Sequence, residues 1–204
     1  IQLEKQIFQL ALSAGFEADF RSWRQSLKAE AVHTFFQEVL PVFAALGELK
    51  ISESMQDLYQ IQKPQVQISS KGSLLEIQFD FQDIDQEEIN RAMKALVAKQ
   101  DYYISSSDQV YYFDEQTKRI RQDLEELGID EIESTAFQAR KSLAYTLSHL
   151  FKDQDQVTFT DEFRHLAHHL THPEDFPMKS LDIRAQLRDY QKKGIQWLQM
   201  LDYY

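Results

Sequence analysis

The chain has 204 residues, a formal net charge of −11, 43% hydrophobic and 12% aromatic residues, and no cysteine. This length fits one or two domains, and the hydrophobic fraction is sufficient for a buried core. The lack of cysteine excludes disulfides and thiolate metal sites, which fits a reducing cytoplasm. Because acidic chains repel phosphate backbones, we expect most of this surface to bind DNA poorly.

The sequence contains no long uncharged apolar run, and its first residues lack the layout of a signal peptide. We therefore expect no transmembrane helix and a cytoplasmic location. Because the first residue is Ile1 and not methionine, we also expect the chain to be a piece of a longer one.

The first 47 residues predict two helices. Apolar residues recur at helical spacing from Leu3 to Ala14, and Gly15 follows where a helix C-terminus favours glycine. A short linker, 16–19, leads towards a second helix at roughly 29–46. Pro41 is expected to kink or end this helix, because proline removes a backbone donor.

The pattern then changes to the period of a strand. Leu49 and Ile51 predict a short strand, and residues 65–82 predict an antiparallel hairpin with its turn at 69–73. The second strand of this hairpin is the clearest in the chain, because apolar and polar residues alternate along it. Its expected buried residues are Leu75, Ile77, Phe79 and Phe81.

Asp85 and Glu88 form the pattern of a capping box at the start of the next helix. A second hairpin is predicted at 102–113, with its turn at 105–108, and a further helix at 114–127. A helix followed by a hairpin also allows a winged-helix interpretation. The turn carries no lysine or arginine to meet a phosphate, which favours ordinary α+β packing.

Two more helices are predicted, one at roughly 136–151 and one beginning after Thr160, a residue that favours the N-cap. Pro173 and Pro177 forbid a continuous helix and indicate a linker. The sequence therefore predicts an α+β fold in which helices pack on small antiparallel hairpins, followed by a linker and a C-terminal helix.

The final segment has apolar residues at steps of three and four, as expected of a helix with one buried side. Within it lies a more particular pattern, made of Leu187, Arg188, Tyr190, Gln191, Gly194, Trp197 and Leu198. A plain amphipathic helix explains the apolar stripe, but it does not explain this combination of residues.

At these residues the chain resembles the bacterial Swi/Snf-type ATP-dependent DNA translocases, in which such a segment opens the first RecA-like ATPase lobe. The resemblance implies that Gln191 contacts adenine, with Arg188 as a weaker nucleotide-binding neighbour. An amide suits adenine because it offers both a donor and an acceptor. The resemblance also implies ATP and Mg²⁺ as cofactors and double-stranded DNA as partner of the parent protein.

None of the five glycines is followed by lysine in the frame of a phosphate-binding loop. We therefore expect this chain alone to be catalytically inactive. Looser patterns, such as the two hairpins, resemble the accessory domain that precedes the ATPase in this family. The implied division is an accessory domain at 1–172, a linker at 173–184 and a truncated ATPase helix at 185–204. A further boundary near residue 58, inside the accessory domain, is compatible with this division.

Two other interpretations stay open. The chain fits a non-enzymatic interaction module whose C-terminal helix docks on a partner. It also contains His165, His168, His169 and His172, which pair at four-residue spacing on one helix. Zinc in a metal-dependent hydrolase requires a third protein ligand, so we expect solvated histidines and no metal.

Overall fold

The computed structural model describes residues 2–20, 22–82, 84–130, 132–133, 135–177, 179 and 186–204. The fold is α+β, as predicted, and it divides into two compact units. Unit 1 comprises Ile1–Gln62 and Ile84–Lys118, and unit 2 comprises Lys63–Asp83 and Arg119–Tyr204. The division into accessory domain, linker and ATPase helix stays a prediction, and residues 178 and 180–185 of the predicted linker and helix lie outside the described residues.

Unit 1 begins with helices and a small hairpin, which are α1 (Gln2–Ser13), β1 (Glu17–Asp19), β2 (Ser22–Arg24), α2 (Ala29–Thr34), η1 (Phe35–Val39) and α3 (Leu40–Ala44). Gly15 ends α1 with φ +83°, the left-handed conformation that a C-terminal glycine permits. The antiparallel pair β1–β2 was not predicted, because part of it was interpreted as a linker.

The predicted helix at 29–46 is found, but Pro41 does not end it. Directly before the proline the helix widens to a π-helical turn, in which the Leu40 N–H donates to the Phe35 carbonyl. Pro41 then lies in the first turn of α3, where the missing N–H is tolerated. The change of helix type is thus how the backbone accommodates the proline.

The rest of unit 1 is a three-stranded sheet with α4 (Glu53–Gln56) and α5 (Gln86–Val97). The strand order is β3-β7-β6, for β3 (Tyr59–Gln62), β6 (Tyr102–Ile104) and β7 (Val110–Phe113). The predicted hairpin β6–β7 is confirmed, and β3 joins it in parallel. The strand expected at Leu49 and Ile51 was wrong, since 48–52 form no strand and α4 follows.

The N-cap predicted for α5 is confirmed, because the Asp85 side chain accepts a hydrogen bond from the Glu88 N–H at 2.9 Å. The second half of the capping box differs from the prediction. The Glu88 carboxylate accepts from the Ser106 N–H at 2.9 Å and is almost fully buried. The buried face of α5 therefore includes Glu88, whereas Val97 at the end of the helix is exposed.

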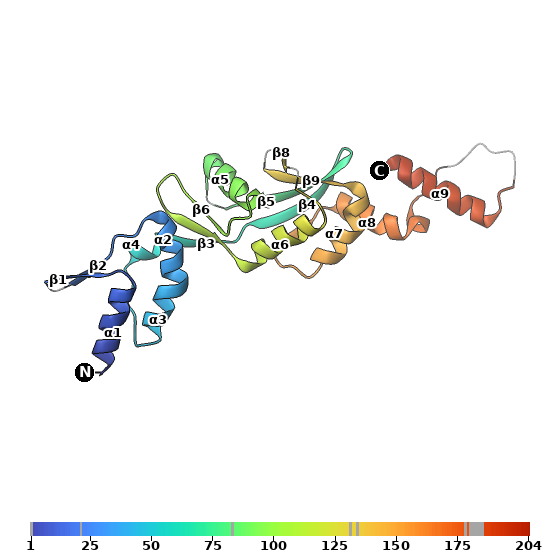
Figure 1. The fold of residues 1–204 in the computed structure, drawn as a ribbon. Coiled ribbons are helices and arrows are strands. Elements are labelled where there is room, and N and C mark those ends of the chain that lie inside the picture. The colour runs from blue at the N-terminus through green and yellow to red at the C-terminus, as the bar shows by residue number, and fades with distance from the viewer. Residues whose placement is uncertain are drawn as a thin grey trace. The chain divides into compact units, whose positions relative to one another are not determined.

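Unit 2 is built on a five-stranded sheet with the order β10-β4-β5-β9-β8. Its strands are β4 (Gln65–Lys71), β5 (Leu74–Asp80), β8 (Ile132–Glu133), β9 (Ala136–Arg140) and β10 (Val157–Phe159). The predicted hairpin β4–β5 is confirmed, with its alternating apolar face buried. It lies in the middle of the sheet (Figure 1). Strand β10 adds to β4 in parallel.

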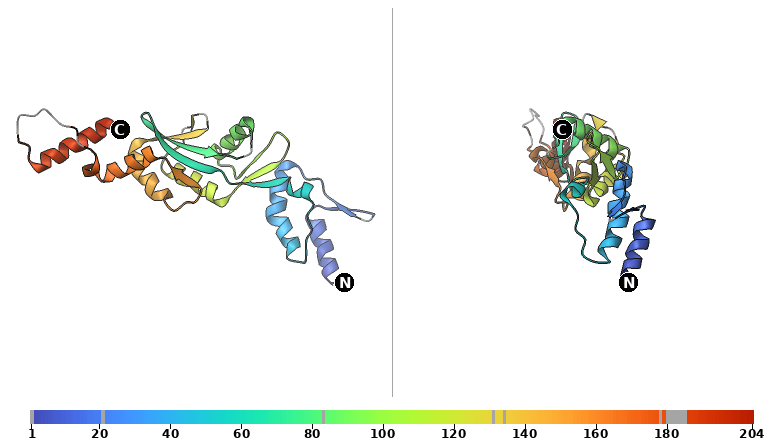
Figure 2. Two further views of the ribbon diagram at one scale, coloured as in Figure 1. Left: turned by 180° about the vertical axis from the view of Figure 1, so that it is seen from behind. Right: turned by 90° about the vertical axis from the view of Figure 1, so that its left-hand side faces the viewer.

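The helical segments of unit 2 are α6 (Glu115–Glu126), η2 (Lys141–Leu143), α7 (Ala144–Phe151), α8 (Asp161–Thr171), η3 (Pro173–Asp175) and α9 (Asp189–Tyr203), with the unit boundary inside α6. Helices α7 and α8 lie side by side, and α8 packs against β4 (Figures 1 and 2). The helix expected at 136–151 was partly wrong. Residues 136–140 form β9, because pairing with β5 places Phe137 and Ala139 on the buried face beside Ile77 and Leu75.

The core of unit 2 consists of side chains with at most 1% exposure, among them Val66, Ile68, Leu75, Ile77, Phe79, Ile120, Leu124, Leu147, Phe151, Phe163 and Leu166. A dry layer of this kind holds the helices against one sheet face. Within the described part of the chain, no helix combines the length and the apolar character needed to cross a membrane.

Candidate functional site

The C-terminal helix α9 carries both residues predicted to contact a nucleotide. Arg188 is its N-cap, with an extended backbone at φ −72° and ψ 158°. The Gln191 side-chain oxygen accepts a hydrogen bond from the Arg188 N–H at 2.9 Å. Both side chains are exposed at the start of the helix. In this structure the amide of Gln191 therefore closes the first turn of its own helix, as a residue at the third helical position often does.

The stripe expected to be the buried side of α9 is largely open. Tyr190 is 66% exposed, Leu198 63% and Leu201 47%, and Trp197 is 49% exposed. Met200, on another side of the helix, is fully buried. The prediction that the Leu187–Leu201 stripe is buried is thus not met within this chain, because α9 packs through different residues.

The C-terminal half of α9 packs against α8 and η3 through polar side chains around Met200. Gln196 donates to the carbonyls of Glu174, at 2.8 Å, and of Phe176. The Tyr204 hydroxyl shares a hydrogen bond of 2.7 Å with His169 Nδ1, and Lys141 donates to the Tyr204 carbonyl. We refer to this group of residues, with Met200, as the α9 anchor.

Of the histidines in and next to α8, His169 takes part in this packing, and the others contact one another or η3. His168 Nε2 lies 2.7 Å from an Asp175 carboxylate oxygen, and its ring stacks on His172 at 4.8 Å between centroids. The ring of His165 is 6.3 Å from that of His169. No group of three or more metal-ligating side chains is found among the residues that the structure describes.

The pKa of His169 is lowered from its usual value of 6.5, first by burial and then by neighbouring His168 and His165, with Asp175 opposing. Burial also raises the pKa of Tyr204 above 10.0, with a further contribution from Tyr203. Both shifts favour the neutral forms, so a neutral hydrogen-bonded pair joins α8 to the end of α9.

Unit 1 contains an aromatic cluster that the sequence analysis did not find. The ring of His33, on α2, stacks on Tyr112 at 4.9 Å and on Tyr102 at 5.1 Å. Tyr59 stacks on Phe36 at 4.7 Å. Pairing of β3, β7 and β6 brings these tyrosines together from positions far apart in sequence. Only the run of aromatic residues at 102–113 could have indicated it.

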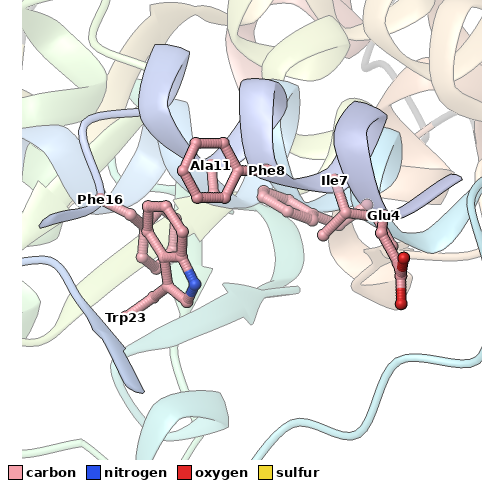
Figure 3. Close-up of a pocket in the computed structure, with 7 residues that line it drawn as sticks. Glu4, Ile7, Phe8, Ala11, Phe16 and Trp23 are labelled. Carbon is pink, nitrogen blue, oxygen red and sulfur yellow. The ribbon is translucent and has the colours of Figure 1, made fainter. Parts of the chain in front are cut away.

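The N-terminal part of unit 1 has an apolar pocket of about 320 Å³. The ring of Phe8 meets Trp23 edge to face at 4.9 Å. Glu4 lies at one end of the row of lining residues, with Phe16 and Trp23 at the other (Figure 3). The lining of the pocket is apolar apart from one carboxylate, so it does not hold a set of catalytic side chains.

The model of a known family, described as bacterial SNF2 helicase associated, matches residues 1–180. The chain therefore belongs to the family of domains associated with bacterial SNF2 helicases. No curated protein and no solved structure matches the chain. The match covers α8 and η3 and ends before α9, so the assignment of α9 rests on the motif from Leu187 to Leu198.

Proposed function

We propose that the chain is the N-terminal accessory region of a Swi/Snf-type ATP-dependent DNA translocase together with the first helix of its ATPase lobe. The observation that carries this proposal is the position of α9. Its first turn presents Gln191 and Arg188, and its C-terminal half is held on α8 and η3, elements of the helicase-associated domain. The accessory domain is thereby joined to the helix that would contact the nucleotide.

In this proposal Gln191 recognises the adenine of ATP. A primary amide supplies one acceptor and two donors, which match the amino group and ring nitrogen of adenine. The bond from the Arg188 N–H uses one lone pair of the amide oxygen, and an amide oxygen has two. The cap therefore orients the side chain and leaves it able to bind a base.

The phosphates and Mg²⁺ would be held by parts of the parent protein outside these 204 residues. Such a site needs a glycine-rich loop ending in lysine, and none of the five glycines here stands in that frame. The parent protein would move along double-stranded DNA. The accessory domain would position or restrain the motor, because the α9 anchor joins α8 to α9.

The proposal is tested with the full-length gene product. We expect Gln191→Ala to reduce hydrolysis of ATP more than of CTP or UTP, because only adenine loses its partner. Gln6→Ala, at an exposed position of α1, is the matched control and should leave all rates unchanged. Equal loss for every nucleotide would refute the adenine contact.

A second measurement concerns the boundary of the motor. The 204-residue chain alone should show no ATP hydrolysis with or without duplex DNA. DNA-stimulated turnover by the pure chain would show that the active site has been placed wrongly.

A non-enzymatic interaction module is the second candidate, favoured by the exposed Tyr190, Trp197 and Leu198 on α9. In the motor these side chains would be covered by the remainder of the ATPase lobe. In the module they would be covered by another protein. The gene sequence after Tyr204 discriminates the two, because a phosphate-binding loop is required by the first and absent from the second.

A further inference from the structure

A groove in unit 1 runs along the outer edge of β6. Strand β6 is the last in the order β3-β7-β6, and α5 packs beside it (Figure 1). The groove has a volume of about 780 Å³. Its floor is formed by residues 100–104, and its walls by the C-terminal half of α5 and by His33.

Two residues of β6 direct their backbone polar groups into this groove. On the paired side, the Phe113 N–H donates to the Asp101 carbonyl at 2.9 Å, and the Ser105 N–H donates to the Gln109 carbonyl at 2.9 Å. Bonded and non-bonded pairs alternate along an antiparallel ladder, so Tyr102 and Ile104 turn their N–H and C=O groups away from β7. A sheet edge with outward donors and acceptors is a template for a further strand.

The α5 wall of the groove is positively charged. Arg91, Lys94 and Lys99 line the groove, and Asp101 is the one acidic residue among its lining side chains. Arg91 and Lys94 lie on the exposed side of α5, where Arg91 also pairs with Glu87 at 3.0 Å and with Glu88 at 3.8 Å. The lining side chains themselves therefore include three cations and one carboxylate, in a chain with a formal net charge of −11.

We propose that this groove binds an extended acidic peptide, which adds to the edge of β6 as a fourth strand. The backbone of the peptide pairs with the outward groups of Tyr102 and Ile104, and its acidic side chains meet Arg91 and Lys94. Main-chain pairing supplies affinity in such β-augmentation, and the charged wall supplies the preference for acidic segments.

The aromatic rings argue for a peptide over a single-stranded nucleic acid. A groove for single strands offers ring faces on which bases stack. Here the ring of His33 already stacks on both Tyr102 and Tyr112, with interplanar angles of 22° and 21°. The backbone N–H and C=O groups at the outer edge of β6 remain directed into the groove, and a peptide strand can form hydrogen bonds with them.

Binding can be tested on the 204-residue chain, independently of the proposed ATPase assignment. The probe is a fluorescent peptide of roughly seven residues, a common strand length, in which valine alternates with glutamate. We expect saturable binding by fluorescence anisotropy that weakens as salt screens the charges. A peptide with lysine in place of glutamate should not bind, and N-methylation at alternate backbone positions of the acidic peptide should abolish binding by removing the donors that pair with β6.

Lys94→Glu should weaken binding of the acidic peptide about tenfold or more, a loss typical of a misplaced like charge. Ile104→Pro, which removes one outward N–H, should have a similar effect. The matched control is Lys50→Glu, at an exposed position outside the groove. Circular dichroism establishes that each variant is folded, and the N-methylated peptide tests strand pairing without any change to the protein.

Three outcomes would overturn the proposal. One is no binding of the acidic peptide, and another is binding that Lys94→Glu and N-methylation leave unchanged. The third is tight binding of a single-stranded oligothymidine that displaces the peptide, which would make the groove a nucleic-acid site.

Discussion

The core of unit 2 and the N-terminal region of unit 1 bury several of their aromatic residues to very different extents. Phe79 on β5 is 1% exposed and Phe163 on α8 is fully buried. In unit 1, Phe8 on α1 is 51% exposed, and Phe20, beside the β1–β2 turn, is 92% exposed. Phe35 of η1 is buried at 4% exposure, but Phe8 and Phe20 lie on an open surface. Phe79 and Phe163, in contrast, belong to a closed core.

This difference shows where each region obtains its stability. In unit 2 the apolar face of the sheet is covered by helices of the same unit, so burial stabilises the fold directly. The exposed apolar residues Leu3, Ile7, Phe8 and Leu12 of α1 contribute less burial within this chain. Mutations of similar chemistry should therefore have unequal effects in the two regions.

The largest effect is expected for Phe79→Ala in β5. The substitution removes a fully buried ring and leaves a cavity, so the free energy of unfolding should fall by about 3–5 kcal/mol. Chemical denaturation followed by circular dichroism measures the change. Phe8→Ala is the comparison and should cost only about 1 kcal/mol, because the ring is 51% exposed and loses mainly its edge-to-face contact with Trp23. If the two variants lose equal stability, the contrast between the regions is wrong.

A smaller effect is expected for Glu88→Ala in α5 of unit 1. Its carboxylate accepts the Ser106 N–H at 2.9 Å in a buried setting. Removing the acceptor leaves that donor without its partner and should cost about 1–3 kcal/mol. Hydrogen exchange of the Ser106 amide should accelerate in parallel.

Glu87→Ala provides the comparison for Glu88. Glu87 pairs with Arg91 at 3.0 Å, as Glu88 does at 3.8 Å, yet the Glu87 side chain is 73% exposed. Surface ion pairs contribute about 0–1 kcal/mol. A Glu87 variant as unstable as the Glu88 variant would show that the ion pair, and not the buried acceptor, maintains this turn.

The cap of α8 in unit 2 should matter less than either core position. Thr160 accepts the Phe163 N–H with its hydroxyl at 3.4 Å. Thr160→Ala removes this acceptor and should cost about 1 kcal/mol, whereas Thr160→Ser keeps the oxygen and should cost little. Thermal unfolding of the three proteins measures the difference, and equal destabilisation by serine and alanine would argue against the cap.

Features that depend on neighbouring residues were predicted well from the sequence. The alternation at Leu75, Ile77 and Phe79 specified β5 and its buried face, and Asp85 and Thr160 marked two helix starts. Features that depend on distant pairing were missed. The segment 136–140 is apolar enough to form either a helix or a strand, and only its pairing with β5 makes it a strand.

The candidate site shows the same division between local features, which were predicted, and contacts between distant residues, which were not. The motif placed Gln191 and Arg188 at the start of a helix, which the structure confirms, while their role stays a prediction. The α9 anchor could not be predicted, because Gln196 and Tyr204 reach it through contacts with Glu174 and His169. Periodicity identified the apolar stripe correctly but assigned it to the buried side, since packing by Met200 and polar residues leaves no periodic signal.

The smallest effect concerns the pH dependence of the α9 anchor. Because burial lowers the pKa of His169 below 6.5, the released and unfolded forms bind a proton before the packed form does. Stability of the packed α9 should therefore decrease as the pH falls through 6.5, and level off below the pKa of the packed form.

Trp197 fluorescence in a Trp23→Phe background reports on α9, because the chain has two tryptophans. The glutamine in His169→Gln still offers Tyr204 a hydrogen-bonding partner but does not titrate. The packing of α9 in this variant should therefore lose most of its dependence on pH. An unchanged pH profile in His169→Gln would show that His169 is not the source of the effect, and the neutral His169–Tyr204 pair would then not be what holds α9.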